Sequence, residues 1–187
     1  MRTVILVLFF LFSISSLQAQ IPENDLWRSL KRGESFVMIR HAEAPGIGDP
    51  KNFELDDCST QRNLSDEGLD QAEQIGRLFR SNGVVRAQVY TSEWCRCKDT
   101  STQLNLGKVN SLSLLNSFFN SYSRKSVQTS ALEDWLDDQF FDTPLILVTH
   151  QVNITAFTEV YPESGEIVFI QRSDKGDYEV LGTIETL

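Results

Sequence analysis

Short apolar runs, each bounded by polar or turn-forming residues, recur along the chain from residue 35 onward. Four of these runs are rich in β-branched or aromatic side chains, and they cover residues 35–39, 87–90, 145–149 and 167–171. Runs of this length and composition predict β-strands. The run 145–149 is almost wholly apolar, which is typical of a strand that is covered on both faces.

Helical periodicity appears between the predicted strands. In the clearest case four apolar residues recur at helical spacing, namely Leu69, Ala72, Ile75 and Phe79. Ser65 is a good N-cap for this helix, and Asn82-Gly83 is expected to end it. Further helices are predicted at residues 24–31, 93–104, 129–140 and 151–160. Strands that alternate with helices predict an α/β domain.

The N-terminal 19 residues have the pattern of a secretory signal peptide. Arg2 precedes an apolar run at residues 4–12, and serines and the small residue Ala19 follow. The run has about half of the roughly 20 apolar residues that a membrane-spanning helix needs, so a retained anchor is the weaker interpretation. We therefore expect cleavage near Ala19 and a periplasmic or secreted protein. Residues 20–187 contain no linker, repeat or low-complexity tract and are predicted to form one domain.

The charge balance bears on the partners of this domain. The whole chain has a formal net charge of −9, and removal of residues 1–19, which contain Arg2 and no acidic residue, makes it −10. Nucleic acids and anionic membrane surfaces are bound mainly by clustered Lys and Arg, so neither is expected as a partner. An anionic small substrate would need a locally cationic pocket.

The three cysteines are Cys58, Cys95 and Cys97. An oxidising compartment favours one disulfide and one remaining thiol, and we expect Cys58 to pair with Cys95 or with Cys97. A zinc site is disfavoured because Cys95-x-Cys97 lacks a second ligand pair at a familiar spacing and the chain has only two histidines. Neither a metal nor another cofactor is expected.

Two predicted strands end at histidines. Arg40 and His41 follow the strand at 35–39, and His150 follows the strand at 145–149. Open α/β sheets bind ligands outside the carboxyl ends of their strands, so both histidines are expected in one crevice. Together with Arg96 they supply two permanent cations and two imidazoles, a set that suits a phosphoryl group. A neutral imidazole can attack phosphorus, while the cations balance charge on the other oxygens.

Four segments, in order, resemble the histidine phosphatase superfamily. They are Arg40-His41-Ala42, which resembles the Arg-His-Gly element; residues 64–72, which resemble the Leu-Ser-x-x-Gly-x-x-Gln-Ala helix start; residues 92–100, which resemble Ser-x-x-x-Arg-x-x-x-Thr; and residues 147–151, which resemble the strand before the second histidine. Ala42 and Gln151 are small departures from the family pattern. The resemblance covers most of the predicted mature chain and implies a phosphoglycerate mutase-like fold, a three-layer α/β/α sandwich with a mostly parallel central sheet.

The resemblance also implies roles for individual residues. His41 would be the nucleophile that forms a phosphohistidine, Arg40 and Arg96 would clamp the phosphate, and a charged His150 would stabilise the transition state. Arg62, which precedes the helix start, is an additional candidate for a phosphate contact, although it could instead bridge nearby acidic residues.

The proton donor is less well defined. Relatives often use an Asp just after the second histidine or a Glu in the inserted segment, but position 151 is Gln and residues 112–125 contain no carboxylate. Glu43, Asp57 and Glu166 are candidate donors because they lie beside strand ends or predicted active-site loops. Alternatively no acid is needed, since phosphoramidates, acyl phosphates and phosphoanhydrides have good leaving groups.

The leading hypothesis is a metal-independent phosphatase acting on a small phosphorylated substrate or a phosphorylated envelope component. A phosphotransferase or mutase on the same fold is disfavoured by export and by the missing carboxylate. A noncatalytic module that binds phosphorylated glycans or lipid headgroups is the alternative from another class, and it leaves His41 unexplained.

Overall fold

The computed structural model describes residues 21–173 and 176–186. The predicted signal peptide, residues 1–19, lies outside the described residues. Among the helices in the described part of the chain, none is long and apolar enough to cross a membrane. The strands are β1 (Ser35–Arg40), β2 (Gln88–Thr91), β3 (Val109–Ser111), β4 (Leu145–Thr149), β5 (Ile167–Arg172) and β6 (Tyr178–Ile184). The α-helices are α1 (Glu23–Lys31), α2 (Asp66–Ser81), α3 (Cys95–Leu104), α4 (Lys125–Asp137) and α5 (Gln151–Thr158).

All of these strands form one sheet in the order β3-β2-β4-β1-β5-β6. The pairs β3–β2, β2–β4 and β4–β1 are parallel, whereas β5 runs antiparallel to both β1 and β6. The sheet is therefore mostly parallel with an antiparallel edge. β1 and β4 lie side by side in its centre, so their carboxyl ends emerge at the same edge.

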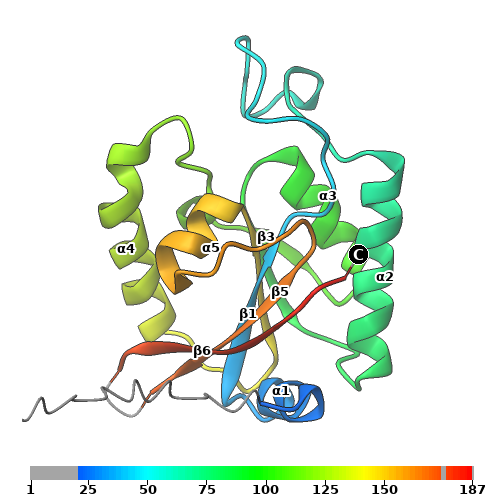
Figure 1. Cartoon of the computed structure of the whole chain (residues 1–187), viewed down its shortest axis with the longest axis vertical. Helices are drawn as coiled ribbons and strands as arrows, with labels where there is room; N and C mark the ends of the chain where they lie inside the picture. The colour runs from blue at the N-terminus through cyan, green and yellow to red at the C-terminus, as the bar shows by residue number, and fades with distance from the viewer. Residues whose placement is uncertain (1–20, 174–175, 187) are drawn as a thin grey trace, which may run out of the picture.

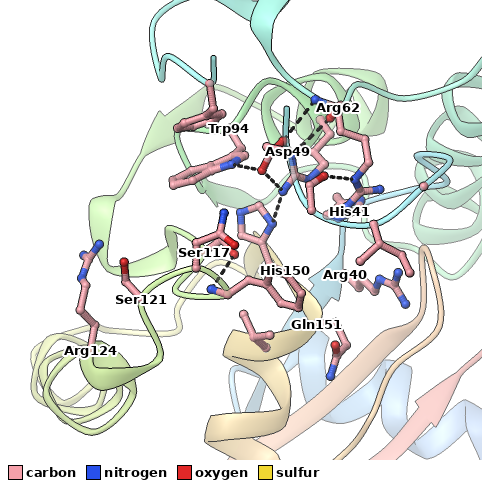
Figure 2. Close-up of a pocket in the computed structure, with 18 of the residues that line it drawn as sticks. Arg40, His41, Asp49, Arg62, Trp94, Ser117, Ser121, Arg124, His150 and Gln151 are labelled. Carbon is pink, nitrogen blue, oxygen red and sulfur yellow. Dashed lines mark hydrogen bonds and ion pairs between the residues drawn. The ribbon is translucent and has the colours of Figure 1, made fainter. Parts of the chain in front are cut away.

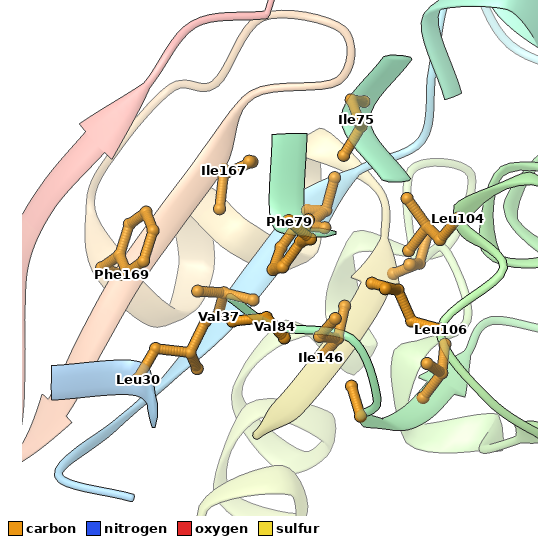
Figure 3. Packing of buried hydrophobic residues seen from close by; sticks show 14 of the residues in the cluster. Leu30, Val37, Ile75, Phe79, Val84, Leu104, Leu106, Ile146, Ile167 and Phe169 are labelled. Carbon is orange, nitrogen blue, oxygen red and sulfur yellow. The ribbon is translucent and has the colours of Figure 1, made fainter. Parts of the chain in front are cut away.

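Helices cover both faces of the sheet, which gives the three-layer sandwich that the sequence predicts. Figure 1 shows α2 and α3 on one side and α4 and α5 on the other. Alternate residues of the central strands point to opposite faces. One apolar cluster joins Val37, Ile146 and Phe169 of the sheet to helices α1, α2 and α3, and Figure 3 shows its packing around Phe79 and Leu104. The other cluster joins Phe36, Met38, Leu147 and Ile170 to Leu132 and Leu136 of α4 and Ile154 of α5.

The four predicted strands are confirmed to within one residue at each end. Two strands were missed. β3 has three residues, two of them polar, and β6 is largely exposed with mixed polarity, so neither gives a clear apolar run. The helix predicted at 129–140 begins earlier, at Lys125, and ends at Asp137. The α2 prediction is confirmed, since Ser65 Oγ accepts a hydrogen bond from Gly68 N at 3.1 Å and the helix ends before Asn82.

Candidate active site

The two histidines lie together at the carboxyl ends of β1 and β4. The register pairs Arg40 with Thr149, and His41 N donates a hydrogen bond to Thr149 O at 2.9 Å. The imidazoles of His41 and His150 are consequently neighbours, with ring centroids 5.5 Å apart and planes inclined by 70° (Figure 2). The expectation that two strand ends deliver both histidines to one crevice is confirmed by this geometry.

Backbone contacts fix the orientation of the His41 ring. Its Nδ1 lies 2.8 Å from the carbonyl oxygen of Ala42, a pure acceptor, so Nδ1 carries the proton. Nε2 is then the unprotonated nitrogen, and no described residue bonds to it. Burial is the main reason that the pKa of His41 lies well below its usual value, and the charge of Arg96 lowers it further. The ring is therefore neutral near pH 7, as a nucleophile must be.

The segment that follows His41 is secured by two of the family-like elements. Thr100 Oγ1 accepts a hydrogen bond from Ala42 N at 3.0 Å and donates one to Arg96 O at 2.7 Å, which ties α3 to this segment. On the other side, Gln71 of α2 accepts a bond from Glu43 N at 2.9 Å and donates one to Ser164 O at 2.7 Å. These residues position the site without lining it.

His150 is held between Arg96 and Ser92. Arg96 Nη2 lies 3.4 Å from His150 Nδ1 and can only donate, so Nδ1 is the acceptor. His150 Nε2 then carries the proton and donates to Ser92 Oγ at 2.8 Å. Burial, followed by the charge of Arg96, places the pKa of His150 well below its usual value. The sequence predicts a charged His150. The structure instead favours the neutral ring as long as no anion lies beside it.

Arg96 is the most constrained cation of the site. Its Nη1 bonds to Asp49 Oδ1 at 2.7 Å and to Arg62 O at 3.2 Å, and its side chain is 3% exposed. Asp49 also accepts hydrogen bonds from Trp94 Nε1 at 3.0 Å and from Arg62 N at 3.1 Å. Burial opposes ionisation of Asp49, but the hydrogen bonds and charge of Arg96 outweigh it and lower the pKa of the carboxyl.

Arg62 and Arg40 complete the cationic wall. Arg62 donates hydrogen bonds to the carbonyl oxygens of Ala44 and Gly48, so it lies in the site and does not bridge surface acids. Arg40 donates to Pro162 O at 2.9 Å. The Nε atoms of Arg40 and Arg96 are buried and have no hydrogen-bond partner among the described residues. Arg40, Arg62 and Arg96 all line the same cavity as His41, and guanidinium groups in such a wall suit the oxygens of a phosphoryl group.

These residues line a cavity of about 420 Å³. Its wall contains Arg40, His41, Asp49, Arg62, Trp94, Arg96, His150 and Gln151, together with Ser117, Phe119, Asn120, Ser121 and Arg124 from the segment between β3 and α4. The cavity wall contains four arginines and one carboxylate, so the cavity is strongly cationic although the chain is acidic. That local charge is what an anionic substrate requires.

The three carboxylates proposed as proton donors do not line this cavity. The Asp57 side chain is exposed and caps the short helix η1 (Cys58–Thr60) by accepting from Ser59 N at 2.9 Å. Glu166 turns back to accept a hydrogen bond from Glu163 N at 2.7 Å. Glu43 is secured by its backbone, and it lies outside the cavity wall as well. Proximity in sequence to a strand end does not set the direction of a side chain, which is why these three residues lie outside the cavity wall.

The cysteines flank the site. Cys58 and Cys95 form a disulfide with Cα atoms 5.7 Å apart, which is one of the two expected pairings. Cys97 is a buried thiol whose Sγ lies 3.5 Å from His150 Nε2, and burial raises the pKa of this thiol to about 12. Among the described residues, no three His, Cys, Asp or Glu side chains are grouped so that they could hold a metal ion.

Sequence reasoning missed Asp49, Trp94 as an anchor for Asp49, and Arg124. The segment Gly46-Ile47-Gly48-Asp49-Pro50 does carry a signal in the sequence, namely two glycines just before a polar residue. In the structure Gly46 and Gly48 adopt positive φ values of 95° and 69°. Glycines at such positions let a loop fold tightly around a polar residue. Arg124 carries no comparable signal, since an arginine before a helix is ordinarily a surface residue.

Comparisons with known proteins support the fold. No protein-family model matches the sequence, and no curated protein does. Among solved structures, the protein histidine phosphatase SixA in complex with tungstate matches with a TM-score of 0.58 and 12% identity over 81% of this chain and 97% of that one. A mycobacterial glucosyl-3-phosphoglycerate phosphatase matches with a TM-score of 0.58 and 14% identity over 79% and 96%. Phosphoserine phosphatase from Entamoeba histolytica matches with a TM-score of 0.57 and 12% identity over 81% and 97%.

The mostly parallel sheet, the two histidines at adjacent strand ends and the cationic cavity define an α/β protein with a candidate site for an anionic ligand. The matched structures belong to the histidine phosphatase superfamily, and this chain has the fold of that superfamily.

Proposed function

We propose that the protein is a phosphatase that works through a phosphohistidine on His41. The observation that carries this proposal is the hydrogen bond between His41 Nδ1 and Ala42 O. It leaves Nε2 unprotonated, with a free lone pair, on a residue that lines a cavity together with arginines. A neutral imidazole with a fixed ring and an unprotonated nitrogen is prepared for in-line attack on phosphorus. A site that only bound phosphate would gain nothing from this arrangement.

The reaction has two steps. In the first, a bond forms between His41 Nε2 and phosphorus while the bond from phosphorus to the leaving group breaks, and the leaving group departs with that electron pair. In the second, water attacks phosphorus, the bond to Nε2 breaks with its electron pair returning to the imidazole, and inorganic phosphate forms as the attacking water releases one proton to the solvent. Arg40, Arg62 and Arg96 would donate hydrogen bonds to the non-bridging oxygens, where charge accumulates in both transition states.

His150 is proposed to share in this charge stabilisation. Its pKa is low because burial and Arg96 disfavour the imidazolium. A phosphate dianion beside both histidines would oppose that effect, because an adjacent negative charge favours protonation. Substrate binding would thereby bring a proton to His150, and the charged form that the family resemblance implies would belong to the complex.

The proposed substrate is a phosphoester, phosphoanhydride or phosphoramidate with a good leaving group. Asp49 is the only carboxylate among the described residues that line the cavity, and it is held as an anion by Arg96. We propose that no metal takes part, since the arginines supply the positive charge. If the predicted signal peptide directs export, the substrate is a small phosphorylated compound or a phosphorylated component of the cell envelope.

The test is turnover of p-nitrophenyl phosphate by the purified protein in the presence of EDTA. We expect hydrolysis that is lost in His41→Ala, with circular dichroism unchanged, and acid-labile, alkali-stable phosphate trapped on the wild-type protein only. A wild-type protein that binds phosphate but hydrolyses nothing in a broad panel of phosphorylated compounds would show a noncatalytic binding module. Transfer of the label to an added alcohol in place of water would show a phosphotransferase.

A further inference from the structure

The cavity has a second end, away from the catalytic arginines. Ser117, Asn120, Ser121 and Arg124 line it and all belong to the segment between β3 and α4. Figure 2 shows Ser117, Ser121 and Arg124 on the opposite side of His150 from Arg40 and Arg62. A substrate whose phosphate lies against His41 would therefore direct its remaining part toward these residues.

Arg124 differs from the other arginines of the cavity. Arg96 is paired with Asp49, and Arg40 and Arg62 donate to backbone carbonyls. The guanidinium of Arg124 has no ion pair or hydrogen bond with any described residue. Residues 112–125 contain no carboxylate, so no anion of its own segment competes for it.

The backbone that carries Arg124 is fixed relative to the phosphate end. Arg124 N donates to Ser121 O at 2.9 Å. Gln128 of α4 donates hydrogen bonds to the carbonyl oxygens of Leu114 at 2.9 Å and Asn116 at 2.6 Å. Asn116 is connected in turn to the second histidine, because Ser92 Oγ donates to Asn116 Oδ1 and accepts from His150 Nε2. The two ends of the cavity therefore belong to one hydrogen-bonded framework.

We propose that Arg124, together with Ser117 and Ser121 of the same cavity wall, binds a second anionic group of the substrate. The inference rests on the proposed phosphatase function and narrows its substrate to phosphorylated compounds that also carry a carboxylate or a second phosphate. Both groups present the paired oxygens that a guanidinium binds in two parallel hydrogen bonds, and hydroxyls can donate to the remaining lone pairs. Arg96 is not available for this second group, because its remaining donors are assigned to the phosphate bound at His41.

The experiment compares substrates that differ in one charge. 4-Carboxyphenyl phosphate and 4-carbamoylphenyl phosphate have nearly the same shape, and the amide is the better leaving group, so chemistry alone favours the amide. We expect wild-type kcat/KM to be about fivefold higher for the carboxylate, the range expected for one partly exposed charge-assisted contact. The preference should weaken as salt is added. The corresponding biphenyl compounds place the carboxylate or the amide farther from the phosphate. Phenylene bisphosphate carries a second phosphate in place of the carboxylate, and it tests which of the two anionic groups is preferred.

Arg124→Ala should abolish the preference, measured as the ratio of kcat/KM for the carboxylate to kcat/KM for the amide, because any general effect on phosphate binding cancels in this ratio. Lys125→Ala is the matched control, because it removes a neighbouring cation that does not line the cavity and should keep the preference. Equal rates for carboxylate and amide at both spacer lengths, with no advantage of the bisphosphate, overturn the inference, as does an equal effect of both variants. Absence of hydrolysis of every probe, with no phosphohistidine, instead overturns the proposed function and this inference with it.

Discussion

The Asp49 carboxylate and the Arg96 guanidinium form a bidentate ion pair inside the cavity wall, with Nη1–Oδ1 and Nη2–Oδ2 distances of 2.7 and 3.3 Å. Their side chains are 8% and 3% exposed. A bidentate pair fixes the plane of the guanidinium as well as its position. Asp49 therefore sets the direction in which the remaining donors of Arg96 point.

Asp49→Ala is expected to weaken substrate binding and to destabilise the fold. Arg96 would lose its orientation, so KM should rise more than kcat falls. Removal of one partner leaves a buried charge uncompensated, which costs about 3 kcal/mol. Steady-state kinetics and urea unfolding measure the two effects. Asp57→Ala is the control on the same loop, since Asp57 is exposed and lies outside the cavity, and its KM should equal that of the wild type.

The buried histidines predict a loss of stability in mild acid. Burial lowers the folded-state pKa of His41 and His150 below the ordinary value of 6.5. Below about pH 6.5 the two histidines bind protons in the unfolded chain but not in the folded chain, so the free energy of unfolding falls as pH falls. Each histidine contributes a slope of up to about 1.4 kcal/mol per pH unit until its folded pKa is reached.

Urea unfolding between pH 7.5 and pH 5 measures this slope. His150→Asn should remove about half of the contribution of the two histidines, whatever its effect on stability at pH 7.5. Tungstate, a phosphate analogue, should reduce the slope in the wild type because a bound anion favours protonation of His150. A slope that is the same in the wild type and in the double variant His41→Asn/His150→Asn would contradict the low pKa values.

The Cys58–Cys95 disulfide connects the loop that carries Asp49 and Arg62 to the start of α3, where Arg96 lies. The two cysteines are 37 residues apart, and closing a loop of that length stabilises a fold by about 2–4 kcal/mol. We expect Cys58→Ser/Cys95→Ser to unfold at lower urea concentration and to show a raised KM. Dithiothreitol should reproduce both effects in the wild type and have none in the double variant. An unchanged KM after reduction would show that the loop holds Arg62 and Asp49 without the crosslink.

The sequence predicts the two histidines of the candidate site better than their surroundings, for a physical reason. His41 and His150 follow buried strands, and buried parallel strands give unmistakable apolar runs whose carboxyl ends must meet at one edge. Asp49 and Arg124 lie on irregular loops, where neither periodicity nor spacing sets the direction of a side chain. The same reason explains why Glu43, Asp57 and Glu166 were proposed for the cavity and lie outside it.

The absence of a free carboxylate from the described wall of the cavity predicts a strong dependence of rate on the leaving group. Asp49 accepts hydrogen bonds from Arg96, Arg62 and Trp94, and its lowered pKa keeps it ionised, so it has no proton to give. No carboxyl group of the described wall can then protonate the leaving group, and we expect it to depart as an anion. The rate of phosphoryl transfer to His41 should therefore fall steeply as the pKa of the leaving group rises.

A series of substituted phenyl phosphates measures this dependence when phosphorylation of His41 is followed in a single turnover. For the wild type we expect the logarithm of the rate to fall steeply with the pKa of the leaving group, and alkyl phosphates to be hydrolysed poorly. In Asp49→Asn the slope of this plot should be unchanged even if all rates fall. A shallow wild-type line that becomes steep in Asp49→Asn would identify Asp49 as the proton donor. That result would mean that substrate binding displaces Arg96 from the carboxylate, because only the loss of this cation would let the pKa of Asp49 rise far enough to hold a proton.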